Sequence, residues 1–537
     1  NMEKKMPNSH SADNLAGSAL IQEIPTNQRG LSELDDKSLT ESSLAIVVIG
    51  ASGDLAKKKT FPALFSLSCL DLLPANTIIA GYARSKISDE NFKAQISQNF
   101  PKKYEHRKQE FLDRCFYFAG GYDSKESFTE FDRVLSDKEK SCGGSVGANR
   151  VFYFAIPPTI FVTVGDSIQP AAMSKSGWNR IVVEKPFGSD LESAELLGSQ
   201  LARLFREEQL YRIDHYLGKE MVQNLMMIRF ANQVFEPIWN ANHIKSITIT
   251  FKENFGTKGR GGYFDSFGII RDVMQNHLLQ ILSLVAMEPP VSLGAEDVRD
   301  EKVKLLRAIS AIELDDVVIG QYGPDPAGSE PGYLDDPTVP NDSVTPTYAC
   351  AVLHIKNTRW HGCPFILKCG KALNERKAEI RVQFKRPKNN LFGELSNNEL
   401  VLRVQPDEAV YLKMSTKKPG LVGGISHTEL DLTYNDKFSD SKLELPDAYE
   451  RLIFDVVRGD HNLFVRSDEL IAAWKIFTPI LHRIEREKIK PLIYEYGSRG
   501  PSEADDLTSR YGFERTVNYQ WNHRSSDGAN TSGAAAK

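Results

Sequence analysis

The chain has 537 residues, of which 41% are hydrophobic and 26% are charged, as in folded globular proteins of several domains. Its net charge of −5 argues against a nucleic-acid partner, and the lack of any apolar run of about 18 residues argues against a membrane partner. The 6 cysteines are scattered without a CxxC pair, so neither a disulfide scaffold nor a metal site is expected. These features predict a cytoplasmic protein with reduced thiols, and a second pool in an organelle is left open.

The two ends of the chain differ in composition from the rest. Residues 1–43 are rich in Ser, Asn, Asp and Glu and contain no aromatic side chain, and residues 525–537 are small and polar. Such segments cannot bury enough apolar surface to offset the entropy lost on ordering. We therefore expect a disordered N-terminal extension and a disordered C-terminal tail, with a regulatory N-terminal arm as the alternative.

Residues 44–49 form a short apolar run, which is typical of a strand covered on both faces of a parallel sheet. The run leads into GASGDLA at residues 50–56 and then into a helical pattern that ends near Leu73. Gly50 permits a tight turn, and Gly53 lets the backbone approach a pyrophosphate at the positive end of a helix. The spacing G-x-x-G-x-x-A departs from G-x-G-x-x-G, so this motif alone is a weak sign of nucleotide binding.

The residue after the second strand distinguishes NADP from NAD. Residues 77–83 form the next apolar run, and Arg84 follows it directly. An acid at this place would bind the ribose 2′-hydroxyl of NAD, whereas an arginine suits the 2′-phosphate of NADP. Asp71 stands at nearly the right distance after the glycines, but it precedes Pro74 and the strand. Arg84 therefore favours NADP, the alternative being an ordinary surface arginine.

Further apolar runs at residues 151–156 and 180–184 alternate with helical patterns, which predicts a doubly wound parallel sheet. Ligands of such sheets bind beyond the carboxyl ends of the strands, where Tyr153 and Lys185 would lie. Pro186 would end the strand ladder and leave Lys185 pointing into the cofactor crevice. The alternative is a strand-end lysine that only extends to solvent.

Ionisable and aromatic residues are concentrated in the segment YRIDHYLGKE at residues 211–220. His215, Tyr216 and Lys219 can donate hydrogen bonds to phosphate oxygens. Asp214 can orient a catalytic imidazole. The segment therefore fits a phosphorylated polar substrate, although an Asp–His pair is otherwise commonly a solvated surface feature.

The strand-like runs of the second half predict an α+β domain. Few helical patterns separate the later runs, which indicates an antiparallel sheet with helices on one face. The runs lie at residues 244–253, 348–356, 365–370, 378–384, 399–404, 409–414 and 429–434. The predicted fold is an α/β Rossmann-type nucleotide-binding domain at residues 44–212, followed by an α+β domain with a large, mainly antiparallel sheet at residues 213–524.

A mostly buried helix is predicted for residues 266–287, and it contains Asp272, Gln275, Asn276 and His277. Buried polar groups need partners, so this cluster faces either a site or a structural network. His277 lies about 140° from Asp272 around an ideal helix, so Asp272 need not be its orienting acid. From the spacing alone, a structural histidine is the more common outcome.

Several sequence motifs resemble those of the eukaryotic glucose-6-phosphate dehydrogenase family. They are GASGDLAKKK at residues 50–59, EKPFG at 184–188, RIDHYLGK at 212–219, RDVMQNH at 271–277 and CGKALNERK at 369–377. The resemblance extends from about residue 44 to residue 521, so only the two ends fall outside it. It implies NADP as the cofactor and oxidation of glucose 6-phosphate to 6-phosphoglucono-1,5-lactone, the first oxidative step of the pentose phosphate pathway.

The resemblance also implies roles for individual residues. His277 would be the general base that takes the C1 hydroxyl proton, and Asp214 would orient it. The substrate would be bound by Lys185, His215, Tyr216, Lys219, Glu253, Asp272, Lys371 and Arg376. The cofactor would be bound by Gly50, Ser52, Gly53, Asp54, Leu55, Arg84, Tyr153 and Lys185.

A second, structural NADP site in the sheet domain is a further implication of the resemblance. The matching positions are Lys377, Arg381, Arg403, Lys413, Asp431, Thr433, Arg499 and Trp521. Basic residues on strand-like runs suit a phosphate-rich ligand, and the tryptophan suits stacking on a ring. Arg515 stands where the family commonly has an aromatic residue, which weakens the case for full stacking. The alternative is an exposed basic face of the sheet.

Two other functions compete with this interpretation. Another sugar oxidoreductase with the Glu-Lys-Pro strand end would not need the phosphate-binding residues at 215–219. A catalytically silent NADP sensor or scaffold would not need His277 together with Asp214. Finally, a homodimer or homotetramer through the outer face of the sheet is expected, from the resemblance and from strand runs that no helix obviously covers.

Overall fold

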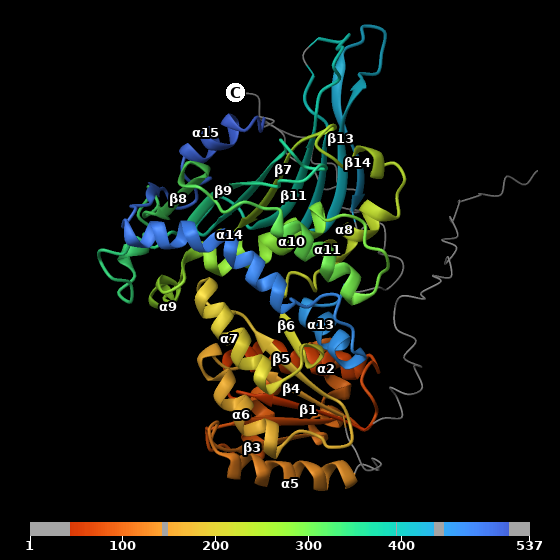
Figure 1. Cartoon of the computed structure of the whole chain (residues 1–537), viewed down its shortest axis with the longest axis vertical. Helices are drawn as coiled ribbons and strands as arrows, with labels where there is room; N and C mark the ends of the chain where they lie inside the picture. The colour runs from red at the N-terminus through yellow and green to blue at the C-terminus, as the bar shows by residue number, and fades with distance from the viewer. Residues whose placement is uncertain (1–42, 142–148, 394, 434–444, 515–537) are drawn as a thin grey trace, which may run out of the picture.

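The computed structural model describes residues 43–141, 149–393, 395–433 and 445–514. Two β-sheets occupy the two ends of the molecule, each with its own helices (Figure 1). Apart from Ser43, the segments predicted to be disordered lie outside the described residues, as do Arg515 and Trp521. Within the described ranges, no helix is both long and apolar enough to cross a membrane.

The first sheet is parallel throughout, with the strand order β3-β2-β1-β4-β5-β6. Its strands are β1 (Leu44–Ile49), β2 (Ile78–Ala83), β3 (Cys115–Ala119), β4 (Asn149–Phe154), β5 (Asn179–Glu184) and β6 (Leu210–Ile213). This confirms the predicted doubly wound sheet and its four predicted strands. The edge strands β3 and β6 were not predicted, because one is partly exposed and the other is only 4 residues long and contains Arg212.

Helices cover both faces of this sheet, which explains why every residue of β1 is buried. Val47 and Val48 point to opposite faces and belong to two separate hydrophobic cores. The core around Val47 includes α5 (Lys125–Ser141), α6 (Phe161–Ala171) and α7 (Leu191–Leu204). The core around Val48 includes α2 (Phe61–Cys69), α3 (Asp89–Ile96) and α4 (Lys108–Asp113).

The helix after the glycine turn is shorter than predicted. It begins with a π-helical segment, η1 (Ala56–Thr60), and continues as α2 to Cys69. The prediction that it ends near Leu73 is wrong. Asp71 has a φ of 55°, in the left-handed region, so a right-handed helix cannot continue through it.

Helix α13 (Ala448–Arg458) comes from the C-terminal part of the chain but packs on the first sheet (Figure 1). Leu452 and Val456 belong to the same core as Val48. The guanidinium of Arg180 donates to the carbonyl oxygens of Val456 and Val457, both at 2.7 Å, at the C-terminal end of this helix. The helix therefore joins the two halves of the molecule.

The second sheet has the strand order β14-β13-β12-β11-β7-β10-β9-β8-β15. Its strands are β7 (Ile244–Lys252), β8 (Val317–Tyr322), β9 (Tyr348–His354), β10 (Pro364–Gly370), β11 (Lys377–Phe384), β12 (Glu399–Gln405), β13 (Ala409–Lys417), β14 (Ile425–Thr433) and β15 (Leu492–Tyr494). The pairs β7–β10 and β8–β15 are parallel and the other pairs antiparallel, which confirms the predicted mainly antiparallel sheet. β14 begins at Ile425 rather than at the predicted residue 429, and Tyr434 lies outside the described residues.

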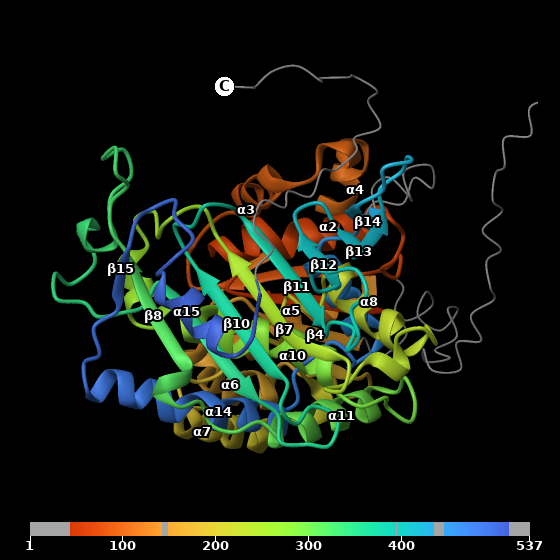
Figure 2. The ribbon, with the colours of Figure 1, turned by 90° about the horizontal axis from the view of Figure 1, so that it is seen from above.

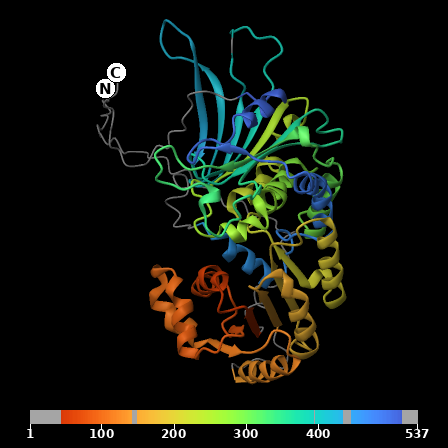
Figure 3. The same ribbon diagram turned by 90° about the vertical axis from the view of Figure 1, so that its left-hand side faces the viewer.

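Helices cover the side of the second sheet that faces the first half of the molecule (Figures 1, 2 and 3). They include α8 (Glu220–Phe230), α10 (Leu279–Ala286), α11 (Ala295–Arg307) and α14 (Ser467–Arg486), whereas α15 (Glu503–Arg510) lies beside β8. Lys302 of α11 and Glu469 of α14 form a buried ion pair of 2.8 Å. Loss of either partner would leave an uncompensated buried charge, so the pair fixes these two helices against each other.

The helix predicted for residues 266–287 begins later than expected and then continues without a break to Ala286. A short helix, α9 (Gly261–Asp265), comes first, and Gly268 then takes a left-handed φ of 68°. The helix proper begins at Ile270 as a π-helix, η7 (Ile270–Leu278), and continues as α10. The wider π-helical turn changes which side chains share a face, so the 140° spacing expected for an ideal α-helix does not apply here.

Candidate active site

Two elements far apart in the sequence bring Asp214 and His277 together. Asp214 directly follows β6, and His277 lies in η7. The Nδ1 of His277 and the Oδ1 of Asp214 are 2.5 Å apart, and both side chains are buried. The same carboxylate oxygen accepts the backbone N–H of Tyr216 at 3.0 Å. The histidine is thus held in one orientation by a carboxylate that is itself fixed by the backbone.

Burial and pairing hold these groups as an ionised carboxylate and a neutral imidazole. Burial alone would raise the pKa of Asp214, but His277 and the Tyr216 amide lower that pKa to about 2. Burial lowers the pKa of His277 from its ordinary value, although Asp214 acts in the opposite direction. Because Nδ1–H is donated to Asp214, the Nε2 of the neutral ring is the atom available to accept a proton.

A cationic and hydrogen-bonding group lies beside this pair, as the segment at residues 211–220 predicted. The ring centroids of His215 and Tyr216 lie 4.5 Å and 4.6 Å from that of His277. The ammonium of Lys219 lies 5.1 Å from the centroid of the Tyr216 ring. The exposed Arg376 interacts electrostatically with both Tyr216 and Lys219. Burial, reinforced by His277, lowers the pKa of His215 well below its ordinary value, so that ring is neutral as well.

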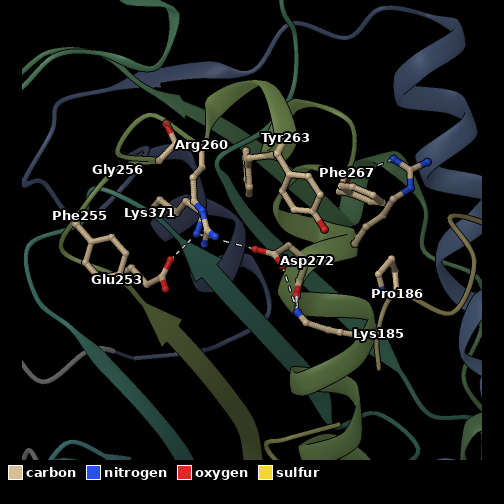
Figure 4. A pocket seen from close by; sticks show the side chains of 13 residues that line it. Lys185, Pro186, Glu253, Phe255, Gly256, Arg260, Tyr263, Phe267, Asp272 and Lys371 are labelled. Atoms are coloured by element: carbon tan, nitrogen blue, oxygen red, sulfur yellow. Dashed lines mark hydrogen bonds and ion pairs between the residues drawn. The ribbon is translucent and has the colours of Figure 1, made fainter. Parts of the chain in front are cut away.

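A cavity of about 300 Å³ contains the other polar residues predicted to bind substrate (Figure 4). Lys185 donates to the backbone carbonyl of Asp272 at 2.6 Å and lies 3.2 Å from its carboxylate. Lys371 donates to the Glu253 carboxylate at 2.5 Å. These two pairs place carboxylates and ammonium groups alternately along one wall, a pattern suited to the hydroxyl groups of a sugar.

The glycine turn after β1 approaches the neighbouring chain so closely that no side chain fits. Gly50 has a φ of 89°, and a Cβ there would lie 2.3 Å from the carbonyl oxygen of Ala155. Its N–H donates to the carbonyl of Tyr82 at 2.8 Å. Arg84 directly follows β2, is exposed, and lies with its guanidinium 5.2 Å from the centroid of the Tyr122 ring. The turn therefore provides a tight backbone loop, and an arginine follows the next strand. A phosphorylated dinucleotide needs both features.

The remaining residues predicted to bind the cofactor lie near this turn or at the next strand ends. Ser52 lies within 3.4 Å of the Ser85 hydroxyl, and Asp54 forms an ion pair of 2.9 Å with Lys58. Tyr153 instead donates its hydroxyl to the buried Glu184 at 2.5 Å. The half-buried Leu55 belongs to the first helical turn.

Asp71, the residue considered as an NAD-type ribose ligand, pairs with Arg107 at 3.0 Å. Strand β2 ends at Ala83, so Arg84 directly follows it, whereas Asp71 lies before the strand.

Donor atoms of Asp214, His215 and His277 also lie within 4.8 Å of one another, a spacing compatible with a metal ion. The hydrogen bond between Asp214 and His277 already occupies one carboxylate oxygen of this set. The contact between Asp214 and His277 therefore fits a histidine base that is oriented by a carboxylate.

Comparisons with known proteins agree with this site. Residues 47–224 match the family model of the glucose-6-phosphate dehydrogenase NAD binding domain, and residues 226–522 match that of the glucose-6-phosphate dehydrogenase C-terminal domain. The chain belongs to the glucose-6-phosphate dehydrogenase family. It is therefore an oxidoreductase with a nucleotide-binding domain.

Close relatives of this family extend over nearly the whole chain. The chain is 61% identical to glucose-6-phosphate 1-dehydrogenase of Dictyostelium discoideum, covering 91% of this chain and 98% of the relative. It is 53% identical to the enzyme of Solanum tuberosum named the cytoplasmic isoform, covering 91% and 95% of the two chains. A solved glucose-6-phosphate dehydrogenase in complex with its substrate glucose 6-phosphate is 48% identical, with a TM-score of 0.86, covering 89% of this chain and 99% of that one.

Most of the described residues predicted for a second, structural NADP site lie on strands β11 to β14, at one edge of the second sheet. Lys377, Arg381 and Lys413 each pair with a glutamate: Lys377 and Arg381 with Glu379, at 3.2 Å and 2.7 Å, and Lys413 with Glu399 at 3.0 Å. Arg403, Asp431 and Thr433 belong to β12 and β14, and Arg499 pairs with Asp505. Trp521 lies outside the described residues. The cross-strand register thus places the members on β11 to β14 together, whereas Arg499 follows β15, the strand at the opposite edge.

Sequence reasoning missed three residues of the site. Gln405 donates to the hydroxyl of Tyr216 at 3.1 Å, and Tyr449 interacts with the buried Glu184. Arg260 is a lining residue of the 300 Å³ cavity. A lone Gln at a strand end and a Tyr at a helix start have no distinctive pattern in a single sequence. Arg260 stands in a glycine-rich loop, which offered the only local signal.

Proposed function

We propose that the chain oxidises glucose 6-phosphate at C1 with NADP as the electron acceptor and His277 as the general base. The buried hydrogen bond of 2.5 Å between Asp214 and His277 is the observation that supports this most strongly. A base oriented in this way, beside the cationic group of Lys219 and Arg376, suits a phosphorylated sugar alcohol. A family relative has been solved with glucose 6-phosphate as its substrate, which supports the same substrate here.

His277 performs the proton transfer in this mechanism. Its Nε2 takes the proton of the C1 hydroxyl as the C1–H bond breaks with its electron pair, and the C1–O bond becomes a carbonyl. NADP, when bound, supplies the nicotinamide that accepts this hydride. Asp214 keeps the ring in the required tautomer and stabilises the imidazolium that forms. The product is 6-phosphoglucono-1,5-lactone.

Binding of the sugar divides between two groups of residues. His215, Tyr216 and Lys219, with Arg376, hold the phosphate. Lys185, Glu253 and Asp272, with Lys371 beside them, hold the hydroxyls. Since Lys185 and Lys371 already contact Asp272 and Glu253, the sugar hydroxyls replace or extend existing hydrogen bonds.

The residues at the glycine turn fit NADP. The Gly50 turn, which a Cβ would fill, receives the pyrophosphate together with Ser52, Gly53, Asp54 and Leu55. Arg84 binds the 2′-phosphate, and Tyr153 and Lys185 lie at the strand ends toward the nicotinamide.

The direct test is the initial rate of absorbance increase at 340 nm with glucose 6-phosphate. Parallel reactions use NADP, NAD, and unphosphorylated glucose. We expect rapid reduction of NADP that requires the phosphate. No reduction by folded protein that still binds NADP would instead favour a silent NADP sensor. Addition of a chelator such as EDTA should leave the rate unchanged, and a loss restored by one divalent metal would show that the donor set of Asp214, His215 and His277 holds an ion.

A second NADP binds the basic face formed by Lys377, Arg381, Arg403 and Lys413, with Asp431, Thr433, Arg499 and Trp521 completing the site. The convergence of these cations on neighbouring strands supports this assignment. Extensively dialysed protein should retain close to one NADP per chain, and Arg381→Ala should release it and lower the melting temperature. Dialysed protein free of nucleotide and equally stable would leave only an exposed basic face.

The enzyme forms a homodimer or homotetramer in the cytoplasm. Strand β14 lies at an edge of the second sheet, and Leu430, Leu432 and Ile425 on it are partly exposed. The name of the potato relative supports the compartment. Sedimentation at micromolar concentration should show particles of at least twice the 60.2 kDa chain mass, and a monomer alone would contradict the assembly.

A further inference from the structure

A loop of the second domain presents Arg260 to the cavity that contains Lys185, Asp272 and Lys371. The loop joins β7 to α9, and Arg260 is its last residue before α9 begins. Figure 4 shows its side chain extending from the loop into the cavity.

Arg260 differs from the other cations of this cavity in its side-chain contacts. Lys185 pairs with Asp272 and Lys371 pairs with Glu253. Arg271 pairs with Glu485 at 2.6 Å and also donates to a backbone carbonyl. Among the described residues, none forms a hydrogen bond or ion pair with the exposed guanidinium of Arg260. The cavity therefore contains one cation that is available for an anionic ligand.

Arg260 also interacts electrostatically with Asp54, in the glycine turn of the first domain. The pKa of Asp54 in that turn lies below its ordinary value, mainly because of the hydrogen bond from Lys58, and Arg260 and Lys57 lower it further. Asp54 follows Gly53 directly, in the segment where the helix begins. Arg260 thus lies within electrostatic range of the turn at which a pyrophosphate is expected to bind.

Hydrogen bonds anchor the loop on both sides of Arg260. The N–H of Thr257 donates to the Tyr322 hydroxyl at 3.0 Å, and the N–H of Gly261 donates to the Asp336 carboxylate at 3.1 Å. A Cβ at Gly261 would lie 2.4 Å from Val339, which shows how closely the loop is packed.

We propose that Arg260 binds the pyrophosphate of NADP from the second domain, opposite the glycine turn of the first. The guanidinium has the planar donor geometry that suits phosphate oxygens, and the pyrophosphate is the part of NADP predicted to lie at the Gly50 turn. NADP would then be held between both domains, by the glycine turn of the first and by Arg260 of the second. This inference rests on the proposed use of NADP.

The test compares Arg260→Ala and Arg260→Gln with Lys258→Ala as a matched control. Lys258 is an exposed cation of the same loop whose ammonium lies 4.9 Å from the Phe255 ring centroid, and it does not line the cavity. We expect both Arg260 variants to raise KM for NADP about 10- to 100-fold, the usual effect of losing a charge-assisted hydrogen bond. KM for glucose 6-phosphate and kcat should stay within about threefold, and Lys258→Ala should resemble the wild type.

Inhibition by adenosine 2′-monophosphate locates the lost contact. This compound has the 2′-phosphate but no pyrophosphate, so its inhibition constant should be the same in the wild type and in the Arg260 variants. An unchanged KM for NADP, an equal loss of affinity for adenosine 2′-monophosphate, or an equal effect of Lys258→Ala would overturn the proposal.

Calorimetric titration of NADP into the same proteins measures affinity without turnover. A wild type that binds NADP but does not oxidise glucose 6-phosphate would contradict the proposed function. Variants that bind NADP as tightly as the wild type would contradict the role of Arg260. The two failures are therefore separate results, and melting temperatures equal to that of the wild type confirm that each variant is folded.

Discussion

The substrate half and the nucleotide half of the site differ in how far they are assembled without ligand. On the substrate side, Lys185 is paired with Asp272, and Asp214 and His277 are buried in contact with each other. On the proposed nucleotide side, Arg84 and Arg260 are exposed and form no ion pair with a described residue. Proton transfer needs groups whose positions are fixed to fractions of an ångström. A long dinucleotide can instead be bound by backbone groups and by arginines that adjust to its phosphates.

The first prediction concerns Asp214, which fixes the orientation of His277 on the substrate side. In Asp214→Asn the amide can no longer favour the same tautomer of His277 or stabilise the imidazolium, because it carries no charge. We expect kcat to fall by about two to four orders of magnitude, with KM for NADP within a few-fold of the wild type. Steady-state kinetics check this, and a loss of less than threefold would show that the pair is structural.

The second prediction concerns the loss of Arg84, a cation on the proposed nucleotide side. Arg84→Ala should lower kcat/KM for NADP by roughly 10- to 100-fold and leave that for NAD nearly unchanged, because only NADP has the 2′-phosphate. Arg133→Ala is the matched control, since Arg133 is an exposed arginine of the same domain that pairs with Glu130. An unchanged ratio of NADP to NAD efficiency would refute the role of Arg84.

The third prediction concerns Glu184, which lies where the two halves meet. Burial raises the pKa of Glu184 to about 7, above its ordinary value of 4.5. The folded state therefore binds this proton more tightly than the unfolded state, and the resulting stability is present at low pH and lost as pH rises from about 4.5 to 7.

The neutral variant Glu184→Gln has no titrating carboxyl at this position, so it does not lose this stability as the pH rises. Relative to the wild type, it should therefore become more stable with increasing pH, by up to roughly 3 kcal/mol above pH 8, or a few degrees in melting temperature. Thermal unfolding at pH 5 and pH 8 measures the difference, with the exposed Glu130→Gln as control. A difference that is independent of pH would show that Glu184 is ionised at both values.

The fourth prediction is a small shift in the pH dependence of the rate. Only the neutral form of His277 can act as a base, and burial lowers its pKa. The enzyme should therefore be active at pH values above the pKa of His277 in the folded protein, and its rate should fall as the pH drops through that pKa. The acid limb of kcat/KM should lie below pH 6.5, the ordinary value for histidine, and a limb above pH 7 would contradict the neutral imidazole.

Much of the fold could be predicted because local patterns determine it. The buried run of β1 and the glycine turn after it are continuous in sequence, and their strand and turn were found where expected. The end of α2 was missed because the left-handed Asp71 is not marked by a glycine. The π-helical start of η7 was missed because it depends on tertiary contacts rather than on composition.

The site was predicted less completely from physical reasoning alone. Asp214 was recognisable in a segment rich in ionisable and aromatic residues, and His277 in a mostly buried helix, but their contact joins the end of β6 to a distant helix. Spacing therefore could not reveal it, and family resemblance was needed. Arg260 lies on a loop and Gln405 at a strand end, and only the fold determines which residues these segments approach.

The most direct test of the account is the turnover of His277→Asn. The control is His461→Asn, because His461 is a partly buried histidine that stacks on Tyr211 away from the cavity. The account predicts that His277→Asn loses about two to four orders of magnitude in kcat while KM for glucose 6-phosphate stays within a few-fold, and that the control remains active. A folded His277→Asn enzyme with a rate near that of the wild type would show that another group takes the proton.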